Sequence, residues 1–148
     1  MKFRFTILFM AVVFLANADQ TIFPVNSVWK YLDNGTNQGT TWRDSSFNDA
    51  AWSSGTAKFG YGEGDENTVV SYGPNPSNKY ITTYFRKAIS ISNLATFSAF
   101  ELGVRRDDGV VVYVNGVEAW RDNINGVVSD TSLAASDASD DGNSIITA

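Results

Sequence analysis

The chain has 148 residues, a formal net charge of −5, and neither histidine nor cysteine. This length suits one domain, and the 16 acidic residues against 11 basic ones disfavour a positively charged nucleic-acid groove. Without histidine and cysteine, the chain lacks Ser-His and Cys-His nucleophiles, thiol redox chemistry and Cys/His zinc sites. The composition therefore favours a folded binding or structural module over an enzyme.

The first 18 residues have the three regions of a secretory signal peptide. Lys2 and Arg4 carry the positive charge, residues 5–15 are apolar except for Thr6, and a small-residue Ala-Asn-Ala cleavage site ends at Ala18. The apolar run is shorter than the roughly 20 residues that span a bilayer. We expect a signal peptide over residues 1–18 and a mature domain over residues 19–148. The product is then secreted, periplasmic or at the cell surface, and does not span a membrane.

The rest of the chain has the pattern of an all-β protein, because short β-branched and aromatic runs are cut by Gly, Asn, Asp and Pro. In chain order, this pattern predicts strands over residues 28–32, 58–62, 80–91, 97–105, 110–114 and 117–121. Loops are expected over residues 62–65, 73–78 and 130–143. Residues 145–148 resemble a fragment of a strand, which suggests a domain that is truncated at its C-terminus.

The strongest local signal is a β-hairpin with Asn115 and Gly116 as its two-residue turn. Asn-Gly suits a type I′ turn, whose two central residues both need a positive φ. Such a turn would pair Val114 with Val117, and simple continuation would pair Val112 with Ala119. The buried face is then expected to carry Val112, Val114, Val117 and Ala119. The other face is expected to carry Val111, Tyr113, Glu118 and Trp120.

Several segments together carry a family resemblance. A Phe-x-Asp-x-x-Trp motif begins at Phe47, residues 59–62 read Phe-Gly-Tyr-Gly, and residues 84–87 read Tyr-Phe-Arg-Lys ahead of an Asp-Asp-Gly turn and the hairpin. In this order and spacing, residues 27–125 resemble the galactose-binding-domain-like β-jelly-roll modules of secreted bacterial multidomain proteins. PA14-type domains share only the Asp-Asp-Gly turn and the strand after it. The Phe-x-Asp-x-x-Trp motif therefore favours the first family.

This resemblance implies an all-β fold, an antiparallel two-sheet jelly-roll sandwich that lacks its final strands. Modules of this kind are usually non-catalytic, lie beside hydrolases and often bind carbohydrate. The resemblance thus implies an accessory module, not an enzyme, that binds carbohydrate or cell-surface glycan. It would target a catalytic domain in the same or a neighbouring polypeptide. The alternative is a structural spacer or docking domain of a larger exported protein, with no small ligand.

The hairpin supplies the candidate carbohydrate-binding residues, since an aromatic ring can stack on the C–H face of a pyranose while polar neighbours fix its hydroxyls. Trp42 and Trp52 bracket the Phe-x-Asp-x-x-Trp motif and are interpreted as core residues. The candidate platform consists of Tyr113, Glu118, Trp120 and Arg121.

Asp107 and Asp108 are candidate ligands for a structural calcium ion, which binds carboxylate and carbonyl oxygens. The alternative is that Asp-Asp-Gly forms a turn whose acidic side chains are neutralised by Arg105 and Arg106. Only two oxygen-bearing side chains are placed here, whereas calcium takes about six or more oxygens. No other cofactor is expected.

Overall fold

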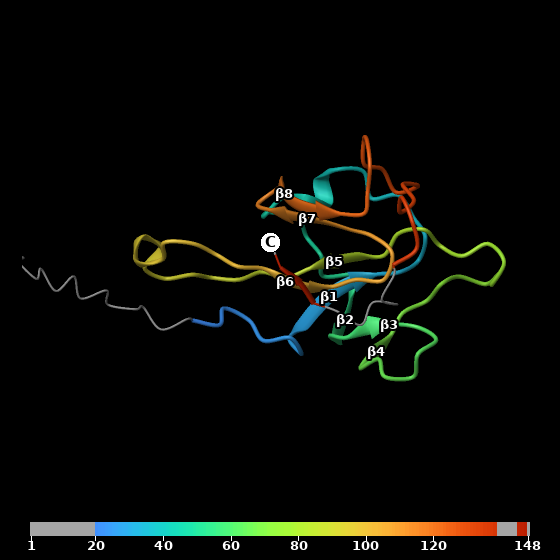
Figure 1. The fold of residues 1–148 in the computed structure, drawn as a ribbon, viewed down its shortest axis with the longest axis horizontal. Coiled ribbons are helices and arrows are strands. Elements are labelled where there is room, and N and C mark those ends of the chain that lie inside the picture. Colours follow the sequence, from blue (N-terminus) through green and yellow to red (C-terminus); the bar gives the residue numbers. More distant parts are fainter. Residues whose placement is uncertain (1–19, 139–144, 148) are drawn as a thin grey trace, which may run out of the picture.

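The structure, a computed structural model, describes residues 20–138 and 145–147. The predicted signal peptide lies outside this part of the chain. Within it, the regular structure is almost entirely strand, so the all-β prediction is confirmed (Figure 1). The elements are β1 (Val28–Leu32), η1 (Thr41–Arg43), β2 (Ser53–Thr56), β3 (Phe59–Gly60), β4 (Thr68–Val69), β5 (Tyr84–Arg86), η2 (Leu94–Thr96), β6 (Gly103–Arg105), β7 (Val110–Val114), β8 (Val117–Asp122) and β9 (Ile145–Thr147). Both η elements are short 3-10 helices.

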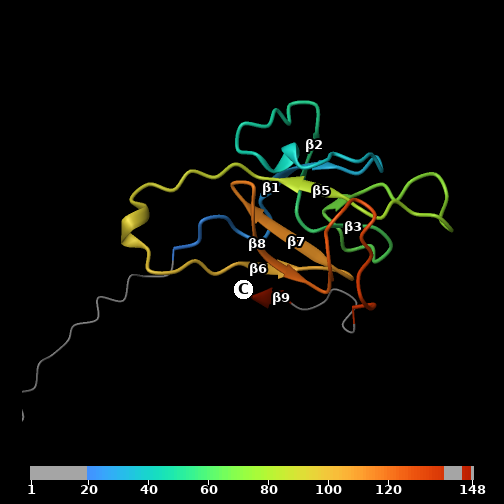
Figure 2. The ribbon, with the colours of Figure 1, turned by 90° about the horizontal axis from the view of Figure 1, so that it is seen from above.

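The strands form one three-stranded sheet and three two-stranded ladders. β1 lies at the centre of the larger sheet and pairs antiparallel with both β2 and β5. β6 pairs antiparallel with β9, β7 pairs antiparallel with β8, and the short β3–β4 pair is parallel. The β7–β8 hairpin lies beside the sheet formed by β1 and β5 (Figure 2). Antiparallel pairing thus dominates the fold.

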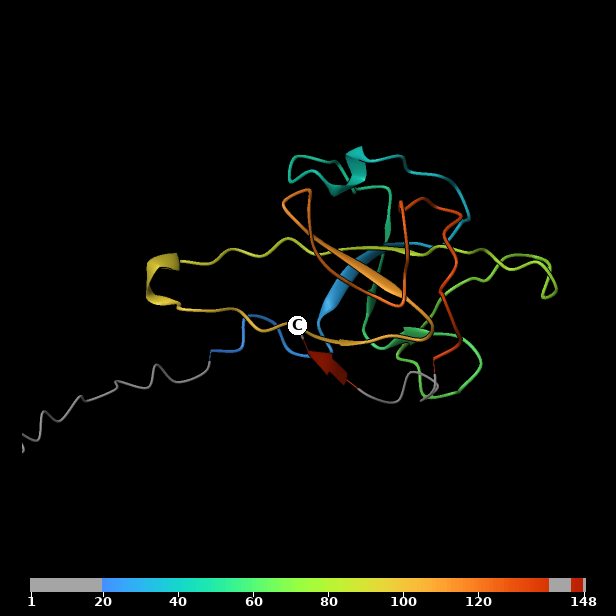
Figure 3. The ribbon, with the colours of Figure 1, turned by 45° about the horizontal axis from the view of Figure 1, so that its top comes forward.

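The long strands predicted over residues 80–91 and 97–105 are much shorter in the structure. Only Tyr84–Arg86 and Gly103–Arg105 form strands, and the chain between them projects from the body with η2 at its tip (Figure 3). A strand needs a neighbour to satisfy its backbone N–H and C=O groups. Among the residues that the structure describes, no strand pairs with residues 87–102. The apolar alternation of this segment was therefore insufficient to predict its conformation.

The predicted hairpin turn is confirmed, since Asn115 and Gly116 have φ values of 50° and 85°. Val114 pairs with Val117 as predicted, but an irregularity between Val112 and Tyr113 shifts the register. Val112 therefore lies opposite Trp120 and not opposite Ala119. An extra residue in one strand of a ladder moves all the residues beyond it to the other face. The sequence contained no signal for this bulge.

The predicted buried face of the hairpin is also wrong. Val114 is 58% exposed, Val117 is 70% exposed, and Ala119 is exposed. The apolar side chains that are buried among the described residues are Trp52, Val70 and Tyr84, at 6–7% exposure. The best-packed part of the molecule therefore lies around β5 and the segment before β2, and not on the Val114–Val117 end of the hairpin.

Candidate functional site

The aromatic residues of the family motifs meet in one cluster. Trp52 lies 5.7 Å from Phe47 and 6.1 Å from Tyr84 between ring centroids. Trp42 packs edge-on against Tyr84 at 5.0 Å and against Tyr113 at 5.8 Å. Edge-to-face pairs at these separations are favourable beyond the area that they bury. The interpretation of Trp52 as a core residue is confirmed by its exposure of 6%, and Trp42 packs in the same cluster while staying partly exposed.

One arginine joins the Phe-x-Asp-x-x-Trp motif to the Tyr-Phe-Arg-Lys motif. Arg86, on β5, donates through Nε to Asp49 Oδ2 at 2.9 Å and through Nη1 to the carbonyl oxygens of Trp42 and Asp44. Its guanidinium also lies over the Phe47 ring, 5.1 Å from the centroid. Two motifs that are far apart in the sequence thus form one structural unit. Their role in this chain is to hold the loop before β2 against β5.

The predicted carbohydrate platform is divided between the two faces of the hairpin. Cross-strand partners share a face, so Tyr113 lies with Glu118, and Arg121 lies with Val111 on that same face. Trp120 lies opposite Val112 and belongs to the other face. The bulge is the reason, because it reverses the side on which the residues after Glu118 project. Three of the four predicted residues are therefore brought together, and Trp120 is not.

On the shared face, the polar groups already bind one another. Arg121 donates from Nε and Nη2 to the two carboxylate oxygens of Glu118, at 2.5 and 2.6 Å. The hydrogen bond from Arg121 lowers the pKa of Glu118, and this bond also raises the pKa of the guanidinium. The Tyr113 ring faces Arg43, whose guanidinium carbon is 4.1 Å from the ring centroid. This face carries a fixed ion pair beside a stacked arginine.

The structure places Asp107 and Asp108 in an exposed turn ahead of β7. Asp108 has a positive φ of 59°, and its Oδ1 accepts a hydrogen bond from the Ala138 N–H at 3.2 Å. Aspartate tolerates this left-handed conformation and is common in turns, while the bond to Ala138 ties the turn to a distant loop. Arg106 pairs with Asp122 at 2.6 Å, and the neutralisation of Asp107 and Asp108 by Arg105 and Arg106 stays a prediction. The geometry supports the turn interpretation of this motif.

A second acidic group lies in the loop after β3. The carboxylates of Glu63, Asp65 and Glu66 lie within 4.8 Å of one another, the single such group of three among the described residues. Two of the three carboxylates have a structural use, since Asp65 pairs with Lys58 at 2.6 Å and Glu66 accepts the N–H groups of Glu63 and Gly64. The bond from Lys58 lowers the pKa of Asp65. These contacts account for the cluster as a loop-forming device.

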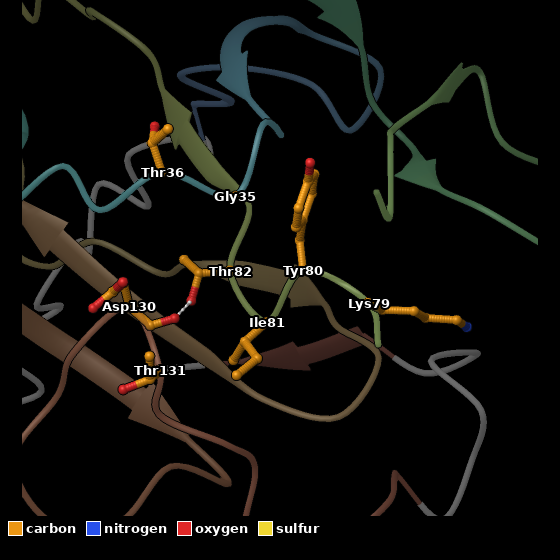
Figure 4. A pocket seen from close by; sticks show the side chains of 8 residues that line it. All are labelled: Gly35, Thr36, Lys79, Tyr80, Ile81, Thr82, Asp130 and Thr131. Atoms are coloured by element: carbon orange, nitrogen blue, oxygen red, sulfur yellow. Dashed lines mark hydrogen bonds between the residues drawn. The ribbon is translucent and has the colours of Figure 1, made fainter. Parts of the chain in front are cut away.

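A cavity of about 160 Å³ lies between three segments that are distant in the sequence. Figure 4 shows the three threonine side chains and the Asp130 carboxylate to the left of the Tyr80 ring, and the Lys79 ammonium directed away from them. The lining residues are Gly35, Thr36, Lys79, Tyr80, Ile81, Thr82, Asp130 and Thr131. The lining thus combines one aromatic ring with several hydrogen-bonding groups.

Hydrogen bonds and close packing fix the walls of this cavity. Thr82 Oγ1 donates to the carbonyl oxygen of Asp130 at 2.7 Å, and Asn37 Nδ2 donates to Asp130 Oδ1 at 2.8 Å. The Tyr80 ring packs on Gly35, where an added Cβ would lie 2.4 Å from the ring. The second oxygen of Asp130 and the Tyr80 hydroxyl make no hydrogen bond within the described part of the chain. The residues that the structure describes thus leave these two polar atoms without a partner.

Sequence reasoning missed this cavity because nothing in the spacing connects its parts. Residues 35–36, 79–82 and 130–131 come from three connecting segments, and two of these were read only as turns or loops. The Asp130–Thr82 and Asp130–Asn37 bonds bring them together across 48 and 93 residues of sequence. Pairing at such separations is a property of the tertiary structure.

Comparison with known proteins does not assign the chain to a family. No family model matches it, and neither the curated proteins nor the solved structures contain a match. Among the described residues, no helix has the length and apolar character needed to cross a membrane. The jelly-roll resemblance therefore rests on the motifs themselves.

Proposed function

We propose that the chain is a non-catalytic, exported accessory module that binds carbohydrate and brings an attached or neighbouring hydrolase to its substrate. The motif order supports this proposal, and so does the way in which Arg86 and the aromatic cluster join the motifs into one unit. We further propose that the antiparallel ladders belong to a jelly-roll type of β-sandwich. Holding a catalytic partner near a polymer raises its effective concentration without any chemistry in the module itself.

The cavity beside Tyr80 is the observation that carries the proposal. Carbohydrate sites combine an aromatic surface with a few fixed polar groups that bind hydroxyls. Here the ring of Tyr80, the carboxylate of Asp130 and the hydroxyls of the lining threonines surround one hollow. Its volume of about 160 Å³ is below the roughly 300–1,000 Å³ of pockets for drug-sized ligands. The cavity thus suits one sugar unit, such as the end of a glycan chain.

The hairpin is a weaker candidate for the same role. Trp120, the largest aromatic group of the predicted platform, lies on the opposite face from Tyr113. Glu118 and Arg121 bind each other through two short hydrogen bonds, so a neutral sugar would have to compete with an ion pair. In the cavity, the second oxygen of Asp130 and the Tyr80 hydroxyl make no such bond to another described residue.

A glycan array with the full chain tests the proposal, and Asp130→Asn locates the site. Asparagine keeps the size of the side chain and an oxygen that can accept the bond from Asn37, while it removes the charge. Asp137→Asn is the matched control, since Asp137 is exposed and does not line the cavity. We expect retention of at least one glycan by the wild-type chain, a loss in Asp130→Asn, and no change in the control.

The array result separates this function from that of a spacer. If a folded chain retains no glycan, the structural spacer or docking role replaces the binding role. If glycans bind but Asp130→Asn and Asp137→Asn behave alike, the module binds carbohydrate elsewhere. The near-ultraviolet circular dichroism of each variant shows whether the aromatic cluster is still packed.

A further inference from the structure

Arg43 differs from the other partly buried arginines, because no carboxylate within the described part of the chain pairs with it. The other three form ion pairs with N···O distances between 2.5 and 2.9 Å, namely Arg86–Asp49, Arg106–Asp122 and Arg121–Glu118. Arg43 Nε is buried and has no hydrogen-bond partner among the residues that the structure describes. Buried polar groups in native proteins are nearly always satisfied, so an unsatisfied guanidinium nitrogen calls for a functional reason.

The local packing holds the Arg43 guanidinium in place without neutralising it. Its carbon atom lies 4.1 Å from the centroid of the Tyr113 ring and 5.8 Å from that of Trp42. η1 also lies against the hairpin turn, since a Cβ added at Gly116 would be 3.8 Å from the Arg43 carbonyl oxygen and 3.5 Å from Asp44 Oδ1. The backbone and the side chain of Arg43 are thus both positioned by β7 and the turn after it.

The nearest acidic side chain on this face is already occupied. Glu118 lies opposite Tyr113 and receives two hydrogen bonds from Arg121. Arg43 and Arg121 therefore supply two positive charges around one carboxylate, in a chain whose overall charge is −5. A guanidinium presents a planar set of donors that matches a carboxylate in two parallel hydrogen bonds. The excess charge and the donor geometry both suit an anionic ligand.

We propose that Arg43, stacked on Tyr113, binds the carboxylate of an acidic sugar. The hydroxyl of Tyr113 has no hydrogen bond among the described residues and is available to a sugar hydroxyl. Arg43 and Tyr113 do not line the cavity at Tyr80, so this site is separate from the one that carries the proposed function. The proposal of an acidic-sugar site can therefore be tested, and can fail, independently of neutral-sugar binding in the cavity.

Calorimetric titration of the full chain with D-galacturonate, D-galactose and acetate tests this proposal. We expect D-galacturonate to bind more tightly than either of the others, because only it offers both a carboxylate and a sugar ring. Arg43→Gln should weaken D-galacturonate binding by between about 10-fold and about 150-fold, the range for hydrogen bonds to charged groups. Arg43→Lys keeps the charge but loses the paired donors, and it should also weaken binding.

Arg105→Gln is the matched control, since Arg105 is exposed and forms no ion pair within the described residues. It should bind D-galacturonate like the wild-type chain. Equal affinity for D-galacturonate and D-galactose would overturn the proposal, as would equal weakening by Arg43→Gln and Arg105→Gln. Equal affinity for acetate would show a general carboxylate site and would overturn the assignment to sugars. Should Arg43→Gln fail to fold, Arg43→Lys and the ligand comparison still decide the question.

Discussion

Replacing Asp49 with asparagine tests whether the carboxylate of the Phe-x-Asp-x-x-Trp motif holds two segments of the fold together. The substitution keeps the shape of the side chain and removes the charge that faces Arg86 Nε at 2.9 Å. Arg86 retains its bonds to the carbonyl oxygens of Trp42 and Asp44, so the guanidinium is not left without acceptors. The variant therefore isolates the contribution of the charged pair.

The expected loss follows from the burial of this pair. The side chains of Arg86 and Asp49 are 15% and 30% exposed, so solvent screens them less than a surface pair. Hydrogen bonds to charged groups contribute about 1.5–3 kcal/mol, against about 0.2–1 kcal/mol for exposed ion pairs. We expect Asp49→Asn to lower the free energy of unfolding by about 1.5–3 kcal/mol. For a domain of this size, that corresponds to a fall in Tm of about 3–12 °C.

Urea unfolding followed by tryptophan fluorescence measures this change, because Trp42 and Trp52 lie in the affected cluster. Asp65→Asn is the control: it removes the same charge from the pair with Lys58, but Asp65 is 58% exposed. Its unfolding midpoint should stay close to that of the wild-type chain. Equal midpoints for Asp49→Asn and Asp65→Asn would refute the reasoning. A double-mutant cycle with Arg86→Met should also show a non-additive coupling between Asp49 and Arg86.

Three further predictions concern the core, the turn and the hairpin face. Trp52→Ala should cost about 3–5 kcal/mol in urea unfolding, since the side chain is 6% exposed and its loss leaves a cavity in the aromatic cluster. Gly116→Ala should cost about 1–2 kcal/mol, because the φ of 85° disfavours a residue with a Cβ. The Glu118 carboxyl should titrate below 4.5 by NMR, and Arg121→Gln should raise its pKa. Because the pKa of Glu118 is lower in the folded chain, the ion pair stabilises the fold at pH values above the pKa of the unfolded chain. This stabilisation is lost as the pH falls through the pKa of the folded chain.

Each of these has a result that contradicts it. Trp52→Ala with an unchanged midpoint would mean that the aromatic cluster does not form the core. A stable Gly116→Ala variant would contradict the type I′ turn, for which Asn115→Gly serves as a tolerated control. A Glu118 pKa that does not respond to Arg121→Gln would show that another group sets it.

Local sequence signals predicted the hairpin but not its register. The Asn115-Gly116 turn follows from a conformational requirement of two adjacent residues, so it was readable without any knowledge of the fold. The bulge between Val112 and Tyr113 depends on how the hairpin packs, and it reversed the face on which Trp120 was expected. The same reasoning predicted all-β structure correctly, because composition and turn residues report on it directly.

Strand lengths depended on partners that the sequence pattern does not reveal. Residues 80–91 alternate as a strand would, yet the ladder with β1 ends after Arg86. β2 was missed because Ser53–Thr56 is polar, and it forms only because β1 offers an edge to pair with. The cavity and the Arg86–Asp49 pair join segments from distant parts of the chain, so no local spacing could predict them.

The central claim is that carbohydrate binds in the cavity beside Tyr80, and an NMR titration tests it most directly. The glycan that the array retains most strongly is added to the ¹⁵N-labelled full chain, and the shifted backbone amides are mapped. The account predicts that the largest shifts fall on Thr36, Ile81 and Thr131, and that Asp130→Asn abolishes them. Shifts confined to the hairpin around Tyr113, or no saturable shifts at all, would contradict it.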